Sequence, residues 1–118
     1  MKRRLRVRRR ADFQAAIAGR RFYSGRSFVA FATPGTAEHD RVGVTVSRGI
    51  RSAVERNRIR RRLREAARMR LLADSGGGRL GIRYDVVLIA RPAALTVSFA
   101  DLEAEAEQAA LRLSNLKS

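Results

Sequence analysis

The residues best suited to binding chemistry in this sequence are the arginines between Glu55 and Arg68. Seven of the fourteen residues in this segment are arginines. A guanidinium group stays charged at any relevant pH, and its planar fork pairs with two oxygens of one phosphate. Several of these arginines recur at spacings of three and four residues, where like charges on a helix repel each other. The segment therefore predicts a surface for a polyanion rather than a face that only keeps the protein soluble.

The same segment carries an apolar seam, which indicates a helix docked on a core. At 100° per residue, one arc of the helix holds Ile59, Leu63, Ala66 and Ala67. The neighbouring arc holds Asn57, Arg60, Arg61, Arg64 and Arg68. A disordered basic tail would not need such a seam, so we expect an arginine-rich helix over residues 54–72. Asn57 either caps this helix or hydrogen-bonds a phosphate or a base, and spacing alone does not separate the two.

The charge of the whole chain indicates the same kind of partner. The 118 residues include 26 Lys and Arg against 11 Asp and Glu, which gives a net charge of +15 at pH 7. Residues 1–70 carry a net +16 and residues 71–118 a net −1, so the binding surface belongs to the first part. Nucleic acid is the expected partner, and an anionic membrane surface is the alternative. The 45% hydrophobic content is sufficient for a single domain over residues 1–118.

Other kinds of site find no support in the sequence. The absence of cysteine excludes disulfides and cysteine-based zinc sites, and the one histidine, His39, lies in a predicted turn. We find no nucleophile–base pair, no paired carboxylates and no phosphate-binding glycine loop. No apolar run approaches the ~20 residues that cross a bilayer, and the basic start lacks the apolar segment of a secretory signal. We expect a cytoplasmic protein with no catalytic residues and no metal site of its own.

The remaining residues form the elements that must position the arginine-rich helix. In chain order we expect a basic arm at residues 1–10, a short helix from Asp12 as N-cap to near Gly19, a short strand near 20–23, strands at 27–33 and 41–47, the arginine-rich helix, a strand at 84–90 and a helix at 99–116. The turn-rich residues 34–40 suggest a hairpin, and residues 75–81 suggest a flexible glycine-rich loop. The fold class is α+β: an α/β sandwich with one mostly antiparallel sheet of about four strands, in the order αβββαβα.

Several details of these elements are also predicted. In the strand at 27–33, Phe28 and Phe31 point to opposite faces of the sheet. Phe28 can therefore fill the core while Phe31 stacks on a base. Core packing is the alternative role for any aromatic residue. Gly43 indicates a bulge or a close backbone approach. Residues 84–90 are the most hydrophobic and are expected to form a central strand. Ser98 is the expected N-cap of the last helix.

The sequence resembles the bacterial ribonuclease P protein subunit in several segments. Val42–Ser47, followed by Ala53–Ala66, is similar to the central signature of that family, a Val-Ser strand and a helix with an Arg-Asn-Arg motif. Leu5–Phe13 resembles its N-terminal motif, Asp85–Arg91 its last strand, and the residues from Ser98 onward its final helix. The resemblance covers nearly the whole chain.

This resemblance implies a left-handed βαβ crossover, against the usual handedness, and a place in a ribonucleoprotein. The enzyme of that family removes the 5′ leader from precursor tRNA, and its RNA subunit is the catalyst, using Mg²⁺ bound mainly by RNA. The protein would be an accessory subunit that binds the catalytic RNA and the leader of precursor tRNA, and a monomer when alone. The alternative is a ribosomal or RNA-chaperone protein with no role in cleavage.

Matching positions give the expected contact residues. The residues expected at the catalytic RNA are Arg48, Arg51, Arg56, Asn57, Arg58, Arg60, Arg61, Arg64 and Arg68, and the basic arm adds Arg8, Arg9 and Arg10. The residues expected to line or support the leader cleft, between the sheet and the N-terminal helix, are Phe13, Ile17, Phe31, Val44 and Val46. The family often has an aromatic residue at the position of Ile17, so we expect an apolar contact there. Arg48 and Gly49 stand where the family often has two lysines, and Arg51 is expected to compensate.

Overall fold

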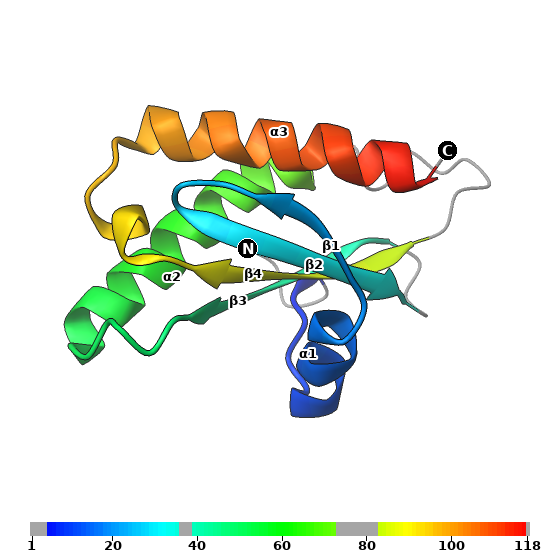
Figure 1. Cartoon of the computed structure of the whole chain (residues 1–118), viewed down its shortest axis with the longest axis horizontal. Coiled ribbons are helices and arrows are strands. Elements are labelled where there is room, and N and C mark those ends of the chain that lie inside the picture. The colour runs from blue at the N-terminus through cyan, green and yellow to red at the C-terminus, as the bar shows by residue number, and fades with distance from the viewer. Residues whose placement is uncertain (1–4, 36–38, 73–82, 118) are drawn as a thin grey trace.

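A computed structural model describes residues 5–35, 39–72 and 83–117 of the protein (Figure 1). In chain order its elements are α1 (Arg10–Ile17), β1 (Arg20–Ser24), β2 (Phe28–Pro34), β3 (Arg41–Val46), α2 (Ala53–Ala66), the π-helical turn η2 (Ala67–Leu71), β4 (Tyr84–Ala90), the 3₁₀ turn η3 (Pro92–Leu95) and α3 (Phe99–Lys117). This confirms the α+β class, the element order and the short strand after α1. The predicted loop at 75–81 lies outside the described residues.

The four strands form one mixed sheet in the order β1-β2-β4-β3. β1 and β2 are antiparallel, as are β2 and β4, whereas β3 and β4 are parallel. The predicted central position of β4 is confirmed, since a continuous apolar strand needs neighbours on both edges. The hairpin predicted over residues 34–40 is wrong, because β4 lies between β2 and β3. The connection from β3 through α2 to β4 is the expected crossover between parallel neighbours.

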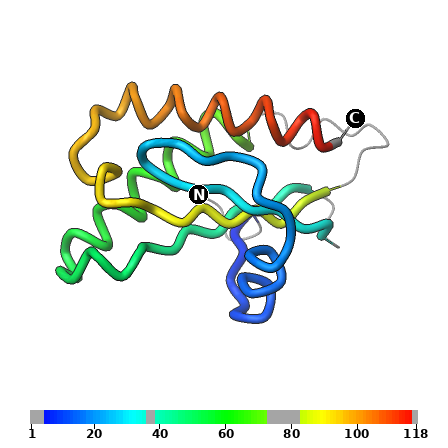
Figure 2. The backbone as a smooth tube through the Cα atoms, viewed as in Figure 1, coloured from blue at the N-terminus to red at the C-terminus, as the bar shows by residue number. Residues whose placement is uncertain are grey.

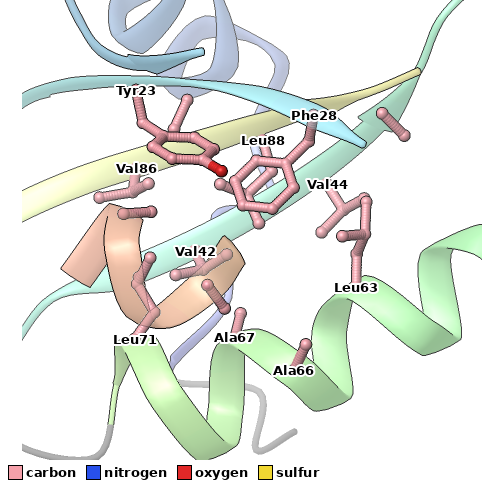
Figure 3. Packing of buried hydrophobic residues seen from close by; sticks show 14 of the residues in the cluster. Tyr23, Phe28, Val42, Val44, Leu63, Ala66, Ala67, Leu71, Val86 and Leu88 are labelled. Atoms are coloured by element: carbon pink, nitrogen blue, oxygen red, sulfur yellow. The ribbon is translucent and has the colours of Figure 1, made fainter. Parts of the chain in front are cut away.

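Helices cover both faces of the sheet (Figure 1). α2 and α3 pack on one face, and α1 packs on the other. The core between the sheet and the two long helices includes Phe28 from β2, Val42, Val44 and Val46 from β3, Val86 and Leu88 from β4, Ile59, Leu63, Ala66 and Ala67 from α2 and η2, and Leu102, Ala106, Ala109 and Leu113 from α3. Figure 3 shows the rings of Tyr23 and Phe28 side by side in this core, with ring centroids 5.0 Å apart.

The N-terminal residues meet the outer edge of β3 at one point and then lead away from the sheet into α1 (Figure 2). Arg6 and Val42 form a parallel bridge, and the amide of Val7 donates to the carbonyl of Val42 over 3.0 Å. Val7 is 4% exposed and Leu5 packs against the core, so the apolar residues that alternate with arginines in the arm face inward. The arm therefore covers an edge that would otherwise present unpaired backbone groups.

The helix starts differ from the predictions in two cases. α1 begins at Arg10 with Arg9 as its N-cap, so the assignment of Asp12 as N-cap is wrong. Asp12 lies in the first turn instead, and its carboxylate pairs with Arg41 on β3. At α2 the hydroxyl of Ser52 accepts from the amide of Glu55 over 3.3 Å, so Ser52, and not Asn57, is the cap.

The start of α3 is as predicted. The hydroxyl of Ser98 accepts a hydrogen bond from the amide of Asp101 over 3.1 Å, which satisfies one of the unpaired amides of the first turn. The carboxylate of Glu103, one turn further, accepts from Arg70 of η2 over 3.0 Å. The last turn of the arginine-rich helix is thereby tied to α3, and the two long helices form one layer over the sheet.

Candidate nucleic-acid interface

The predicted division of the arginine-rich helix into two faces is confirmed by the burial of its side chains. Ile59, Leu63 and Ala66 are at most 1% exposed and face the sheet. The side chains on the opposite side are exposed or half-buried, and together we call them the arginine face: Asn57, Arg58, Arg60, Arg61, Arg64 and Arg68. Because the apolar seam fixes the rotation of α2, the charged groups point away from the core in a defined arrangement.

Two hydrogen bonds organise the arginine face internally. The guanidinium of Arg60 donates to the side-chain oxygen of Asn57 over 3.1 Å, so Asn57 holds Arg60 in place. Arg68 pairs with Glu65, and this hydrogen bond lowers the pKa of the Glu65 carboxyl. The charge of Arg68 is therefore partly neutralised. Among the described residues, Arg58 and Arg61 form no ion pair with a carboxylate.

Two other arginines of α2 are bound to backbone carbonyl groups of the protein. Arg56, which was expected at the catalytic RNA, donates to the carbonyl of Ile50 over 2.9 Å and so fixes the loop before α2. Arg62, which was not in the predicted set, donates to the carbonyls of Ala94 and Leu95 over 3.1 and 2.8 Å, and to that of Val97. Burial, and then the charge of Arg58, lowers the pKa of Arg62. Arg62 thus links α2 to the segment before α3.

The arginine face continues onto the N-terminal arm. Arg6, Arg61, Arg64 and Glu65 line a cavity of about 400 Å³ between the arm and α2. Burial, followed by the charges of Arg6 and Arg60, lowers the pKa of Arg64, so like charges repel at this place. An anion in the cavity would relieve that repulsion. The sequence analysis missed Arg6, although its alternation with the inward-facing Val7 could have placed it beside the body of the domain.

The second surface lies on the other face of the sheet, where α1 packs. Phe31, Val87 and Gly43 are partners in the strand register, so their side-chain positions share this face. The ring of Phe13 rests on Gly43, because a Cβ atom built there would be 2.6 Å from the ring. The predicted close approach at Gly43 is thereby confirmed, and the ring of Phe13 on α1 reaches β3 at this point.

A cavity of about 380 Å³ lies between α1 and β3, and we call it the α1 cleft. Its lining residues are Arg8, Arg10, Phe13, Ile17, Val44 and Thr45. The structure therefore brings together Phe13, Ile17 and Val44, as expected, and it adds Arg8 and Arg10. Ile17 is 39% exposed, so an apolar surface is available for contact. Thr45 was missed, although its position between two inward-facing valines could have placed it on this face.

The remaining expected cleft residues lie at a distance from this cavity or behind it. Val46 is 6% exposed and belongs to the core on the α2 side of the sheet, so it supports β3 from behind. Phe31 is half-buried on the α1 side but does not line the cavity. Arg48 and Arg51 are exposed in the loop before α2, next to the arginine face.

Metal-binding clusters and membrane-spanning helices are two further features that concern function. Among residues 5–35, 39–72 and 83–117, no three His, Cys, Asp or Glu side chains lie close enough to hold a metal ion. None of the described helices has the length and apolar character that a bilayer-spanning segment requires.

The fold and the two surfaces define a class of protein: a small basic α+β domain with an arginine face and a partly apolar cleft on opposite sides of one sheet. Comparison with known proteins gives the family. The Ribonuclease P family model matches residues 1–114, and the chain belongs to this family. A role in the ribonuclease P holoenzyme, beside its RNA subunit and in tRNA processing, follows from this membership.

Individual relatives agree with the family in sequence and in structure. The ribonuclease P protein component of Acidothermus cellulolyticus is 38% identical, over 97% of this chain and 92% of the relative. The structure of the Staphylococcus aureus RNase P protein superposes with a TM-score of 0.70 at 25% identity, over 97% of this chain and 98% of that one. The RNase P protein from Thermotoga maritima gives a TM-score of 0.66 at 25% identity, over 95% and 94% of the two chains.

Proposed function

We propose that the chain binds the catalytic RNA of ribonuclease P through the arginine face and the 5′ leader of precursor tRNA through the α1 cleft. In this proposal the RNA subunit performs the hydrolysis, and the protein supplies no catalytic group. The observation that carries the proposal is the outward placement of the arginines of α2, which the buried seam of Ile59, Leu63 and Ala66 holds in one orientation.

The arginine face suits a folded RNA because it offers several guanidinium groups at fixed spacing. Each arginine that neutralises a phosphate releases condensed counterions, so affinity depends steeply on salt. Arg58 and Arg61 are exposed, and Arg6 extends the same surface onto the arm. A rigid arrangement reduces the conformational entropy that flexible side chains lose on binding, because the helix is already ordered by its core contacts.

The α1 cleft suits a single strand because it combines apolar and cationic groups. Phe13 and Ile17 offer apolar surface to an unpaired base, and Arg8 and Arg10 stand at the rim, where they can reach the phosphates. Thr45 adds a hydroxyl group that can donate to or accept from a base edge. Bases in a duplex are stacked and paired, so a leader without secondary structure is the fitting ligand.

In this proposal Mg²⁺ belongs to the RNA subunit and the substrate. The described carboxylates nearest the α1 cleft, Asp12 and Asp85, are paired with Arg41 and form no cluster for a hard cation. This pairing supports the assignment of Mg²⁺ to the RNA. What the protein contributes is positive charge, which lowers the repulsion between two large RNA molecules.

The test of the arginine face is the binding of the catalytic RNA by Arg58→Ala and Arg61→Ala at several salt concentrations. Each substitution should lower the affinity and reduce the slope of log K against log salt by about one. Arg112→Ala is the matched control, since it removes the same charge from the exposed side of α3. Unchanged affinity and unchanged slope in both α2 variants would contradict the proposal.

The α1 cleft is tested by comparing precursor tRNA with mature tRNA. A protein that binds the leader must discriminate between them when it is assembled with the catalytic RNA. A ribosomal or RNA-chaperone protein shares the basic surface and the salt dependence but has no reason to discriminate. Equal affinity of the assembled complex for the two RNAs would therefore contradict leader binding by the α1 cleft, without affecting the proposed role of the arginine face.

A further inference from the structure

Charged side chains from three separate segments meet at one end of the α1 side of the sheet. Arg41 of β3 donates from Nε to Oδ1 of Asp85 over 2.8 Å and from Nη2 to Oδ2 of Asp85 over 2.6 Å. The same Nη2 lies 3.4 Å from the carboxylate of Asp12 in the first turn of α1. We call the contact between Asp12 and Arg41 the latch. It joins a helix to the sheet across 29 residues of sequence.

The sheet side of the latch is rigid. Arg41 and Asp85 are register partners on the parallel strands β3 and β4, so their side chains lie next to each other on one face. The side chain of Asp85 is 8% exposed, and it accepts both hydrogen bonds in the bidentate geometry that fixes a guanidinium group. Arg41 is thus held by Asp85, and Nη2, which already donates to Asp85, also faces the carboxylate of Asp12 on α1.

The helix side of the latch is a short and mostly exposed element. α1 has eight residues, and among them Ala16 alone is buried. A helix of this length is marginal without tertiary contacts. Its C-terminal end is held where Gly19 approaches β2 so closely that a Cβ atom there would lie 2.4 Å from the carbonyl oxygen of Ala32. Towards the N-terminal end of the helix, the latch is the ion pair that joins α1 to the sheet in the described residues.

The latch lies next to the cleft both in sequence and in space. Phe13 follows Asp12 directly, and its ring rests on Gly43, which is two residues from Arg41 on the same face of β3. A shift of α1 at Asp12 therefore moves the ring of Phe13 across the sheet. A second cavity, of about 450 Å³, leaves space for such a shift, and its lining includes Arg8, Arg9, Asp12, Ala15, Thr33 and Arg41.

We propose that Asp12 is a positioning residue, which acts through Arg41 and Asp85 to hold α1 at the angle that forms the α1 cleft. The proposal rests on the proposed function, because the effect of the latch is measured as a change in leader binding. It assigns Asp12 no contact with RNA. The side chain of Asp12 is 32% exposed, so salt screens the latch and the effect of its loss is a moderate one.

The experiment uses the full chain assembled with a bacterial ribonuclease P RNA. Asp12→Asn removes the charge and keeps the shape, whereas Asp12→Glu keeps the charge and can still reach Arg41. Glu103→Gln is the matched control, since it removes the carboxylate of another helix-borne ion pair, Arg70–Glu103, on the far side of the sheet. Two quantities are measured for each variant: amide hydrogen exchange of α1, and the ratio of affinities for precursor and mature tRNA.

Asp12→Asn should speed the exchange of the α1 amides and lower the affinity ratio by about two- to fivefold, as expected for one screened ion pair. Asp12→Glu should restore both quantities, and Glu103→Gln should change neither. In an Arg41→Lys background, Asp12→Asn should cause little further loss, because the two residues act together. An additive loss in that background would assign Asp12 to helix-dipole stabilisation and overturn the latch.

The exchange measurement separates failure of the latch from failure of the proposed function. Unchanged α1 exchange in Asp12→Asn would overturn the latch, whatever the RNA affinities are. A parent complex that bound precursor and mature tRNA equally would contradict leader binding, and the exchange of α1 would still decide whether Asp12 holds the helix. Accelerated exchange with an unchanged affinity ratio would show that the angle of α1 does not set the cleft, which overturns the inference.

Discussion

Substitution of Gly43 by alanine should displace α1 from the sheet. A Cβ atom at this position would lie 2.6 and 2.7 Å from two ring carbons of Phe13 and 3.1 Å from Cβ of Val7. Carbon atoms normally touch at about 3.5–4.0 Å, so the ring must move by about 1 Å. The backbone around β3 is held by β4 on one side and by the N-terminal arm on the other. The ring of Phe13, and with it the short helix α1 that carries it, is therefore expected to move before the strand does.

The magnitude follows from two opposing effects. Overpacking of a well-packed site costs about 1–3 kcal/mol, whereas alanine gains about 0.5–1 kcal/mol over glycine in the unfolded chain and the strand. The net loss in the free energy of unfolding is then about 1–2 kcal/mol, which corresponds to a fall in Tm of about 4–8 °C for a domain of this size. Leader binding should weaken as well, because the ring of Phe13 leaves its place beside Thr45.

The assay is urea and thermal unfolding of Gly43→Ala together with a matched glycine control. Gly49→Ala is that control, since its added Cβ would meet nothing closer than 4.0 Å, at Cγ of Pro92. In a Phe13→Leu background, which removes the ring, Gly43→Ala should cost much less than in the parent. The reasoning is refuted if Gly43→Ala and Gly49→Ala have the same Tm as the parent, or if the Phe13→Leu background leaves the loss unchanged.

Three further outcomes are expected. Phe31→Ala should weaken precursor tRNA binding more than mature tRNA binding, since Phe31 is half-buried on the cleft side of β2; equal losses would remove it from the leader path. Arg62→Ala should lower the free energy of unfolding by about 1–3 kcal/mol, because three backbone carbonyls lose their donor, while the salt slope of RNA binding stays as in the parent. Burial, and then the charge of Glu105, raises the pKa of Tyr23 to about 12. An unfolded tyrosine has a pKa of ~10, so the stability that the protonated Tyr23 contributes is complete below pH ~10 and is lost as the pH rises towards ~12. Denaturation of the parent and of Tyr23→Phe at pH 9 and 11 measures this loss. An equal pH dependence of the two proteins would contradict it.

Local patterns in the sequence predicted the elements and the arginine face well. The seam of Ile59 and Leu63 is periodic over several turns, and periodicity of this kind depends on neighbours along the chain. The same holds for Ser98, whose cap is completed three residues later. The order of the strands in the sheet was not predicted by such local patterns. The turn-rich residues 34–40 do reverse the chain, but the more hydrophobic β4 enters between β2 and β3.

Contacts between distant segments were not predictable in the same way. Asp12 has the residue type and position of an N-cap, and its partner Arg41 is known only once β3 and α1 pack together. Arg62 lies among six other arginines of the same segment, and it is the position of η3 that turns it into a structural residue. Val44 and Val46 must share one face of β3, but the face that α1 covers is set by the packing of Phe13 on Gly43.

Reconstitution with a bacterial ribonuclease P RNA is the decisive measurement for the proposed role of this chain. Cleavage of a 5′-leader tRNA precursor is followed at low Mg²⁺ with the RNA alone, the protein alone and the two together. An accessory subunit predicts efficient cleavage only in the mixture, because the basic protein offsets the repulsion between the RNAs. Cleavage by the protein alone, or tight RNA binding without any stimulation of cleavage, would contradict this role.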